Sequence, residues 1–318
     1  MRWYGAQYNF PRVRPENLSF FEVLQERGWK NVGITSHFYF DERRNVHQGF
    51  DVWDNHDAKS LEDSHTDIAA PRIWGKVEPV IEDLGREARE KGEEAAPFSL
   101  FVHFFDPHAR WNYREEFGFE RGSTTRERHM AAYDSEIAFA DRYVGKIVDK
   151  LKEEGLYDDV IFVITSDHGE AFNEHGYYFH GQTLYNTVAN VPMLIRVPGW
   201  FSRQVEGPVS IIDIAPTLLD LIGVTIPTDF EGRSLSTVML GQSEVPKRPI
   251  FTELLPYTAF NEHHRAVIYG DEKLIVNFTL DVEELYDLSE DPMEQNNLIN
   301  ERPERAKILR EMLDEFMN

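Results

Sequence analysis

The feature that most constrains the fold is the segment VIFVIT, from Val160 to Thr165, in which every residue is apolar or β-branched. Such a run is typical of a strand that is buried on both faces of a parallel sheet. Directly after it come Ser166-Asp167-His168-Gly169, which place an acid and an imidazole at the carboxyl end of the strand. Because open α/β sheets bind their ligands at that edge, we expect a ligand site here.

The residue types at this turn favour a cation or an anion as the ligand. Asp167 and His168 are adjacent, so a carboxylate oxygen and an imidazole nitrogen can reach one cation. His180 follows in Phe179-His180-Gly181, after a stretch without helical periodicity. Each of these residues alone would more often be a solvated loop residue. Three of them after so apolar a strand favour a metal or anion site.

Apolar patterns and turn residues predict that strands alternate with helices over the rest of the chain. The predicted strands are Asn31–Ser36, Phe98–Phe105 and Val191–Val197. The predicted helices are Pro15–Gly28, Ser64–Gly92 with a proline interruption at Pro79, Thr124–Glu154 and Ser210–Ile222. This alternation predicts an α/β fold with a mainly parallel sheet flanked by helices.

The pattern changes after about residue 245. Short segments with strand character and a Gly270-Asp271 turn predict a small antiparallel sheet, and Pro303–Met317 predicts a closing helix. The strand segments are Pro249–Glu253, Arg265–Tyr269 and Lys273–Phe278. We therefore expect two domains, residues 1–245 for the α/β core and residues 246–318 for the antiparallel sheet with its helix.

Composition excludes several classes of partner and site. The 56 acidic residues exceed the 33 lysines and arginines, giving a net charge of −23, which argues against nucleic acid or an anionic membrane as a partner. Without cysteine the chain can form neither a disulfide nor a thiolate metal site. No apolar run is long enough to span a membrane. No signal peptide is visible at Met1, which favours the cytoplasm while leaving the compartment open.

Three segments resemble the sulfatase family of the alkaline-phosphatase-like superfamily. They are DHGEAFNEHG with HGQTLYNTVANVPMLIRVPG, the segment Phe104-Phe105-Asp106-Pro107-His108, and Glu284-Leu285-Tyr286-Asp287-Leu288 followed by Asp291-Pro292 and the stretch from Glu294 to Leu298. They occur in the order found in the family, and the resemblance covers nearly the whole chain. It implies an alkaline-phosphatase-like core and the hydrolysis of sulfate monoesters.

The resemblance also assigns roles to individual residues. It implies that Asp167 and His168 bind a divalent metal, usually calcium in the family, with magnesium or manganese as alternatives. His108 matches the family histidine that contacts sulfate and can protonate the leaving alcohol. His180 falls where many members have a sulfate-binding lysine, and His37 aligns loosely with a pocket residue. We expect Asp167, His168, His108 and His180 to converge on one small anion held against a cation.

One part of the family pattern does not occur in these residues. Members begin with a strand that ends in paired aspartates, followed by a C- or S-x-P-x-R segment whose first residue becomes the formylglycine nucleophile. We therefore expect a core that lacks its first strand and nucleophile loop, is inactive by itself, and exposes a sheet edge through which oligomers could form. Truncation of the sequence is the preferred explanation, ahead of a second chain that supplies the missing part or a degenerate relative.

Two other functions stay open at this point. The same fold could hydrolyse a phosphomonoester, phosphodiester or phosphonate, or the chain could be a non-catalytic protein that binds a sulfated or phosphorylated partner. The substrate cannot be read from the loops Arg110–Arg128 and Thr252–His264. His103, inside an apolar strand, is expected to be a core residue, and Glu170 and His175 are either supporting residues of the site or solvated loop residues.

Overall fold

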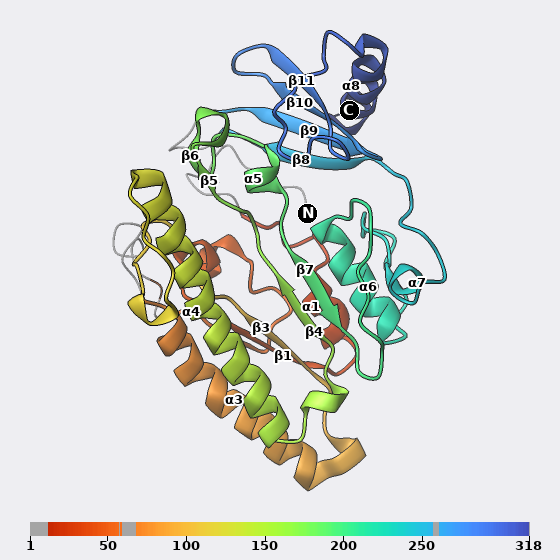
Figure 1. Cartoon of the computed structure of the whole chain (residues 1–318). Helices are drawn as coiled ribbons and strands as arrows, with labels where there is room; N and C mark the ends of the chain where they lie inside the picture. Colours follow the sequence, from red (N-terminus) through yellow and green to blue (C-terminus); the bar gives the residue numbers. More distant parts are fainter. Residues whose placement is uncertain (1–11, 57, 59–67, 257–260, 318) are drawn as a thin grey trace. The chain divides into compact units, whose positions relative to one another are not determined.

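A computed structural model describes residues 12–56, 58, 68–256 and 261–317 of the chain (Figure 1). The chain forms two compact units, Met1–Val160 and Ile161–Asn318. Besides the helices and strands named below, short 3₁₀ turns lie at Phe38–Phe40, Glu42–Arg44, Gly92–Glu94, Glu115–Phe117, Tyr157–Asp159, Glu174–Gly176 and Ile211–Asp213.

The first unit is built on a parallel sheet of three strands in the order β2-β1-β3. These strands are β1 (Lys30–Ile34), β2 (Val52–Asp54) and β3 (Phe98–Val102). Val32 on the central strand pairs with Val52 on one side and with Leu100 on the other. The two predicted strands are confirmed in shortened form, whereas β2 was missed because three residues show no periodicity. Directly after β1 the hydroxyl of Thr35 donates to Asn55 Oδ1 at 2.9 Å.

Three helices lie in the described part of the first unit. They are α1 (Phe20–Gln25), α3 (Ala70–Lys91) and α4 (Thr125–Glu153), and the two long helices α3 and α4 pack side by side (Figure 1). Helix α1 starts later than predicted because Ser19, rather than Pro15, caps it.

The predicted interruption at Pro79 is wrong, because α3 continues through this exposed position. The predicted start of this helix at Ser64 lies outside the described residues.

In the second unit the strand after Val160 has a different partner from the one expected. Strand β4 (Phe162–Thr165) pairs antiparallel with β7 (Met193–Arg196), and Ile164 is 36% exposed. The prediction of a parallel strand buried on both faces is therefore wrong. A parallel partner requires a crossover connection, usually a helix. The chain between β4 and β7 contains only short elements: β5 (Ala171–Phe172), β6 (Tyr178–Phe179) and α5 (Asn186–Ala189).

In the rest of the second unit the predicted helices and strands are present, whereas the short helix at residues 236–239 and the strand at residues 282–287 were not predicted. Helices α6 (Ile214–Leu221) and α7 (Ser236–Met239) precede an antiparallel sheet in the order β11-β10-β9-β8. The strands of this sheet are β8 (Ile250–Leu254), β9 (His264–Tyr269), β10 (Glu272–Asn277) and β11 (Val282–Asp287). Helix α8 (Pro303–Met317) packs on it through a core that includes Leu274, Leu285, Leu309 and Leu313 (Figure 1). The fold class is confirmed: a parallel sheet with helices and an antiparallel sheet in the C-terminal region.

Candidate functional site

The turn that carries Asp167 and His168 rests on the short helix α5. The backbone N–H of Gly169 donates to the carbonyl oxygen of Val188 at 2.8 Å. A Cβ atom at Gly169 would lie only 2.3 Å from the carbonyl oxygen of Thr187, so no larger residue fits without a shift of the backbone. Glycine therefore allows the close approach that holds the turn against α5.

Asp167 and His168 have the donor types and spacing of two ligands for one cation. His168 Nδ1 lies 2.8 Å from the carbonyl oxygen of Gly169, so Nδ1 carries the hydrogen and the lone pair is on Nε2. His168 Nε2 lies 3.9 Å from Asp167 Oδ2. A cation bound at about 2.0 to 2.6 Å from each atom accommodates this separation.

Two side chains would supply only part of the ligands that a calcium ion needs. Calcium takes about six to eight oxygen ligands in proteins. Within residues 12–56, 58, 68–256 and 261–317, no group of three or more histidine and acidic side chains is arranged to hold a metal ion. The side chain of Asp167 is 79% exposed, which leaves room for further ligands. The two residues fit a divalent cation in chemistry without enclosing it.

His180 lies directly against His168. The two imidazole rings stack with centroids 4.0 Å apart and an angle of 27° between their planes. The β5–β6 hairpin, in which Ala171 pairs with Phe179, brings Glu170 and His180 together, and His180 Nδ1 lies 3.1 Å from Glu170 Oε1. The side chain of Glu170 is only 3% exposed. Glu170 therefore orients the ring of His180 and forms an ion pair with it when the ring is protonated.

The first unit brings the other two predicted histidines together. The rings of His37 and His108 both stack on Phe105, with centroid distances of 4.2 Å and 4.4 Å, and their own centroids are 6.3 Å apart. His37 Nδ1 accepts a hydrogen bond from the backbone N–H of Tyr39, so His37 Nε2 carries the ring hydrogen. His108 Nδ1 lies 2.6 Å from the carbonyl oxygen of Ala109, so Nδ1 carries a hydrogen and Nε2 is the ring nitrogen of His108 that is left for a substrate.

A buried charged cluster holds the segment that leads to His108. Asp106 Oδ2 accepts from the backbone N–H of Ala70 at 2.8 Å and so caps α3, whose own N-cap residue has no capping side chain. Arg114 Nη2 lies 3.9 Å from Asp106 Oδ1 and 3.3 Å from Glu136 Oε1. Burial raises the pKa of Glu136 to about 7, against the opposing effect of Asn112 and Arg114.

Glu136 was missed at the level of sequence, although a signal existed. It lies on the apolar stripe of α4 with Ala132, Phe139 and Ala140, where an acid has no solvent to face. Arg114 is likewise turned inward, with its guanidinium 3.5 Å from the centre of the Phe139 ring.

The other residues singled out in the sequence lie in different parts of the structure. His103 is half-buried beside Phe40, at 4.6 Å between ring centroids. His175 Nε2 lies 3.1 Å from the carbonyl oxygen of Met293, and its ring stacks on Tyr185. Part of the predicted specificity loop Thr252–His264, residues 257–260, lies outside the described residues.

The structure therefore forms two groups of candidate residues: His37 with His108 in the first unit, and Asp167, His168 and His180 in the second. Convergence of all of them on one anion stays a prediction.

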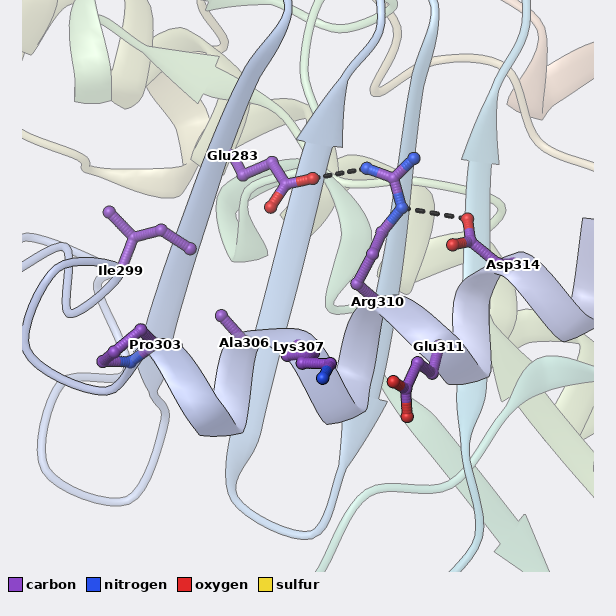
Figure 2. Close-up of a pocket in the computed structure, with 8 residues that line it drawn as sticks. All are labelled: Glu283, Ile299, Pro303, Ala306, Lys307, Arg310, Glu311 and Asp314. Carbon is purple, nitrogen blue, oxygen red and sulfur yellow. Dashed lines mark hydrogen bonds and ion pairs between the residues drawn. The ribbon is translucent and has the colours of Figure 1, made fainter.

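Two further features lie outside these groups. A pocket between β11 and α8 is lined by charged side chains, with Arg310 joined to both Glu283 and Asp314 (Figure 2). It contains none of the predicted site residues.

None of the helices in the described part of the chain combines the length and the apolar character that a membrane span requires.

A family model described as Sulfatase matches residues 4–224, and one described as N-sulphoglucosamine sulphohydrolase, C-terminal, matches residues 173–318. An N-acetylglucosamine-6-O-sulfatase of Bacteroides thetaiotaomicron is 30% identical over 200 residues, which cover 59% of this chain and 36% of that protein. An ulvan-active sulfatase of Formosa agariphila is 25% identical over 338 residues, which cover 95% of this chain and 65% of that protein. The chain thus spans less than two thirds of the length of either relative.

Solved structures share the fold. A protein in complex with its substrate D-glucosamine-2-N,6-O-disulfate superposes with a TM-score of 0.72 at 19% identity, covering 96% of this chain and 82% of the other. A putative sulfatase from Bacteroides fragilis gives a TM-score of 0.77 at 19% identity, covering 96% and 78%. A phosphonate monoester hydrolase of Agrobacterium radiobacter gives 0.73 at 19% identity, covering 96% and 81%. The fold is therefore that of the sulfatases and of their alkaline-phosphatase-like relatives.

Proposed function

The chain belongs to the sulfatase family, and from this premise we propose that the protein is a sulfuric ester hydrolase that acts on a sulfate monoester. The observation that carries the proposal is the stacked pair His168–His180 beside Asp167 and Glu170, in a chain that the sulfatase family model matches over residues 4–224. A sulfated sugar is the substrate class that we favour, because structural neighbours include a protein solved with a disulfated glucosamine.

In this proposal Asp167 Oδ2 and His168 Nε2 hold a divalent cation. Calcium is the preferred ion, with magnesium and manganese as alternatives, since the imidazole ligand suits calcium less well than carboxylates do. The bound cation supplies Lewis-acid stabilisation of the negative charge on the sulfate oxygens.

The three other histidines act on the substrate. Glu170 accepts a hydrogen bond from His180 Nδ1–H, and the protonated ring of His180 then donates from Nε2–H to a sulfate oxygen. His37 donates from Nε2 in the same way, since its Nδ1 accepts from Tyr39. His108, held at Nδ1 by the carbonyl of Ala109, delivers a proton from Nε2 to the oxygen of the leaving alcohol.

The 318 residues contain no C- or S-x-P-x-R segment, and the proposal therefore includes that this chain alone does not turn over a sulfate ester. The purified chain is assayed for hydrolysis of an aryl sulfate and an aryl phosphate, with calcium present. We expect no release of phenol from either ester. Sustained release of phenol from the sulfate would contradict the expected inactivity while supporting the reaction class.

Binding separates the proposed substrate from its alternatives. Calorimetric titration with a sulfated sugar and with the matching phosphorylated sugar, both with calcium, is expected to give tighter binding of the sulfate. Preference for the phosphate monoester would favour a phosphatase or phosphonate hydrolase of the same fold. Binding of neither ligand would refute the proposed function.

A further inference from the structure

A fully buried ion pair joins the C-terminal sheet to the segment that follows His180. Lys273 on β10 and Glu294 have side chains that are 0% and 1% exposed, and Lys273 Nζ lies 2.7 Å from Glu294 Oε1. Lys273 Nζ also donates to the carbonyl oxygen of Leu184 at 2.7 Å and to Asn186 Oδ1 at 2.9 Å. Glu294 Oε2 accepts from the backbone N–H of Asn186. Both charges thus bind the chain at Leu184–Asn186.

This arrangement is costly for the fold. Removing two charges from water is unfavourable, and apolar side chains of similar volume often stabilise a protein at least as well as a buried ion pair. Glu294 also has a φ of +57°, a left-handed conformation that non-glycine residues adopt at an energetic cost. General stability therefore does not explain why a buried ion pair stands here. Its contacts with Leu184–Asn186 offer an explanation, because they fix the position of that segment.

The position of Leu184–Asn186 determines where the turn with the candidate metal ligands lies. Asn186 is the first residue of α5, and the next residues of α5 provide the carbonyl groups of Thr187 and Val188 on which Gly169 rests. The contacts therefore run without a gap from Glu294 to Asn186, through α5, and on to Gly169 in the turn that carries Asp167 and His168.

Two further contacts bind residues near the candidate site to the segment just before Glu294. The side-chain amide of Asn186 donates to the carbonyl oxygen of Pro292 at 3.1 Å, and His175 contacts the carbonyl oxygen of Met293. The loop between β5 and β6, which precedes His180, is thus fastened to the segment around Glu294 as well.

We infer that Lys273 and Glu294 are positioning residues for the turn Asp167-His168-Gly169 and for the stacked pair His168–His180. They fix α5, and α5 fixes the turn; neither residue touches the substrate. The inference rests on the proposed function for its relevance to catalysis, and it gives the C-terminal sheet a part in the geometry of that same site.

The test replaces both charges at once in the whole chain, with Lys273→Met and Glu294→Met. The double variant keeps apolar volume at both positions but removes the hydrogen-bond partners of the Leu184 carbonyl and of Asn186, so it is expected to melt below the wild-type temperature. The readout is the set of ring-proton NMR signals of His168 and His180, which the stacking at 4.0 Å shifts away from those of an exposed histidine such as His56. In the double variant we expect both signals to move toward that of His56.

Glu283→Gln is the matched control. It breaks the ion pair between Glu283 on β11 of the same sheet and Arg310 on α8 (Figure 2). This variant is expected to leave both histidine signals in place.

If the double variant does not fold, Asn186→Ala serves as the second variant, because it keeps both charges and removes the side-chain links to Lys273 and Pro292. In this variant the NMR signals of His168 and His180 are expected to move toward that of His56 by a smaller amount. Unchanged His168 and His180 signals in whichever of these variants folds would overturn the inference. The readout requires no turnover, so failure of the proposed function and failure of this inference give different results.

Discussion

Replacing Glu136 by glutamine tests the energetics of the cluster that holds the segment before His108. Glu136 is 1% exposed on α4, beside Arg114 and within reach of Asp106. The variant keeps the volume and the hydrogen-bonding capacity of the side chain and removes its ionisation. The prediction concerns how the free energy of unfolding changes with pH.

The sign follows from the pKa values of the two states. Burial raises the pKa of Glu136 from 4.5 to about 7 in the folded protein, so between pH 4.5 and 7 the folded state binds this proton more tightly than the unfolded state. The folded state is therefore progressively destabilised as pH rises through this window. A shift of this size corresponds to at most about 3 kcal/mol between pH 4 and pH 8, at about 1.4 kcal/mol for each pH unit. Glu136→Gln removes this contribution.

Urea denaturation at pH 5 and pH 8 measures the effect, since the midpoint follows the free energy of unfolding when the slope is unchanged. Other acids titrate as well, so the relevant quantity is the difference between wild type and variant. We expect Glu136→Gln to gain stability relative to wild type at pH 8 compared with pH 5. Asp141→Asn, at an exposed position of the same helix, serves as the control. An identical pH dependence in wild type and Glu136→Gln would refute the reasoning.

Two predictions concern stability elsewhere in the chain. Thr124→Ala is expected to lower the free energy of unfolding by about 1 kcal/mol, because the hydroxyl of Thr124 caps α4 by accepting from Glu127 N–H. Thermal melts check this, and Thr124→Ser should melt near the wild type. Leu309→Ala is expected to cost about 2 to 5 kcal/mol, because Leu309 is fully buried between α8 and the C-terminal sheet. Lys307→Ala on the exposed face of α8 is the control for urea titration, and equal losses in the two variants would contradict the packing argument.

Local signals in the sequence predicted much of the fold. The bounds of α4 and α8 agree with the structure because Thr124 with Glu127, and Pro303, specify the starts of these helices through neighbouring residues. The antiparallel pairing of β4 could not be predicted from Val160–Thr165. Its direction depends on the path of the chain to Met193, which no property of the strand itself encodes.

The candidate site residues could be chosen from the sequence, whereas the residues that hold them in place could not. Asp167, His168 and His180 stand out as polar residues after an apolar strand, but the stacking of the two histidines depends on a hairpin whose strands have only two residues each. Lys273 follows a turn in an apparently ordinary strand pattern, and Glu294 is distant in sequence. Their pairing, like that of Glu136 with Arg114, exists only in the folded chain.

The central claim is that Asp167 and His168 hold a cation beside which His180 binds sulfate, and its most direct test is a sulfate titration followed by the ring-proton NMR signals of His168 and His180. With calcium present, both signals should shift together with one dissociation constant. Without calcium, or in Asp167→Asn, sulfate should bind at least about tenfold more weakly, the effect of losing a contact worth about 1.5 kcal/mol or more. Titration curves that are the same with and without calcium, and the same in Asp167→Asn, would contradict the claim.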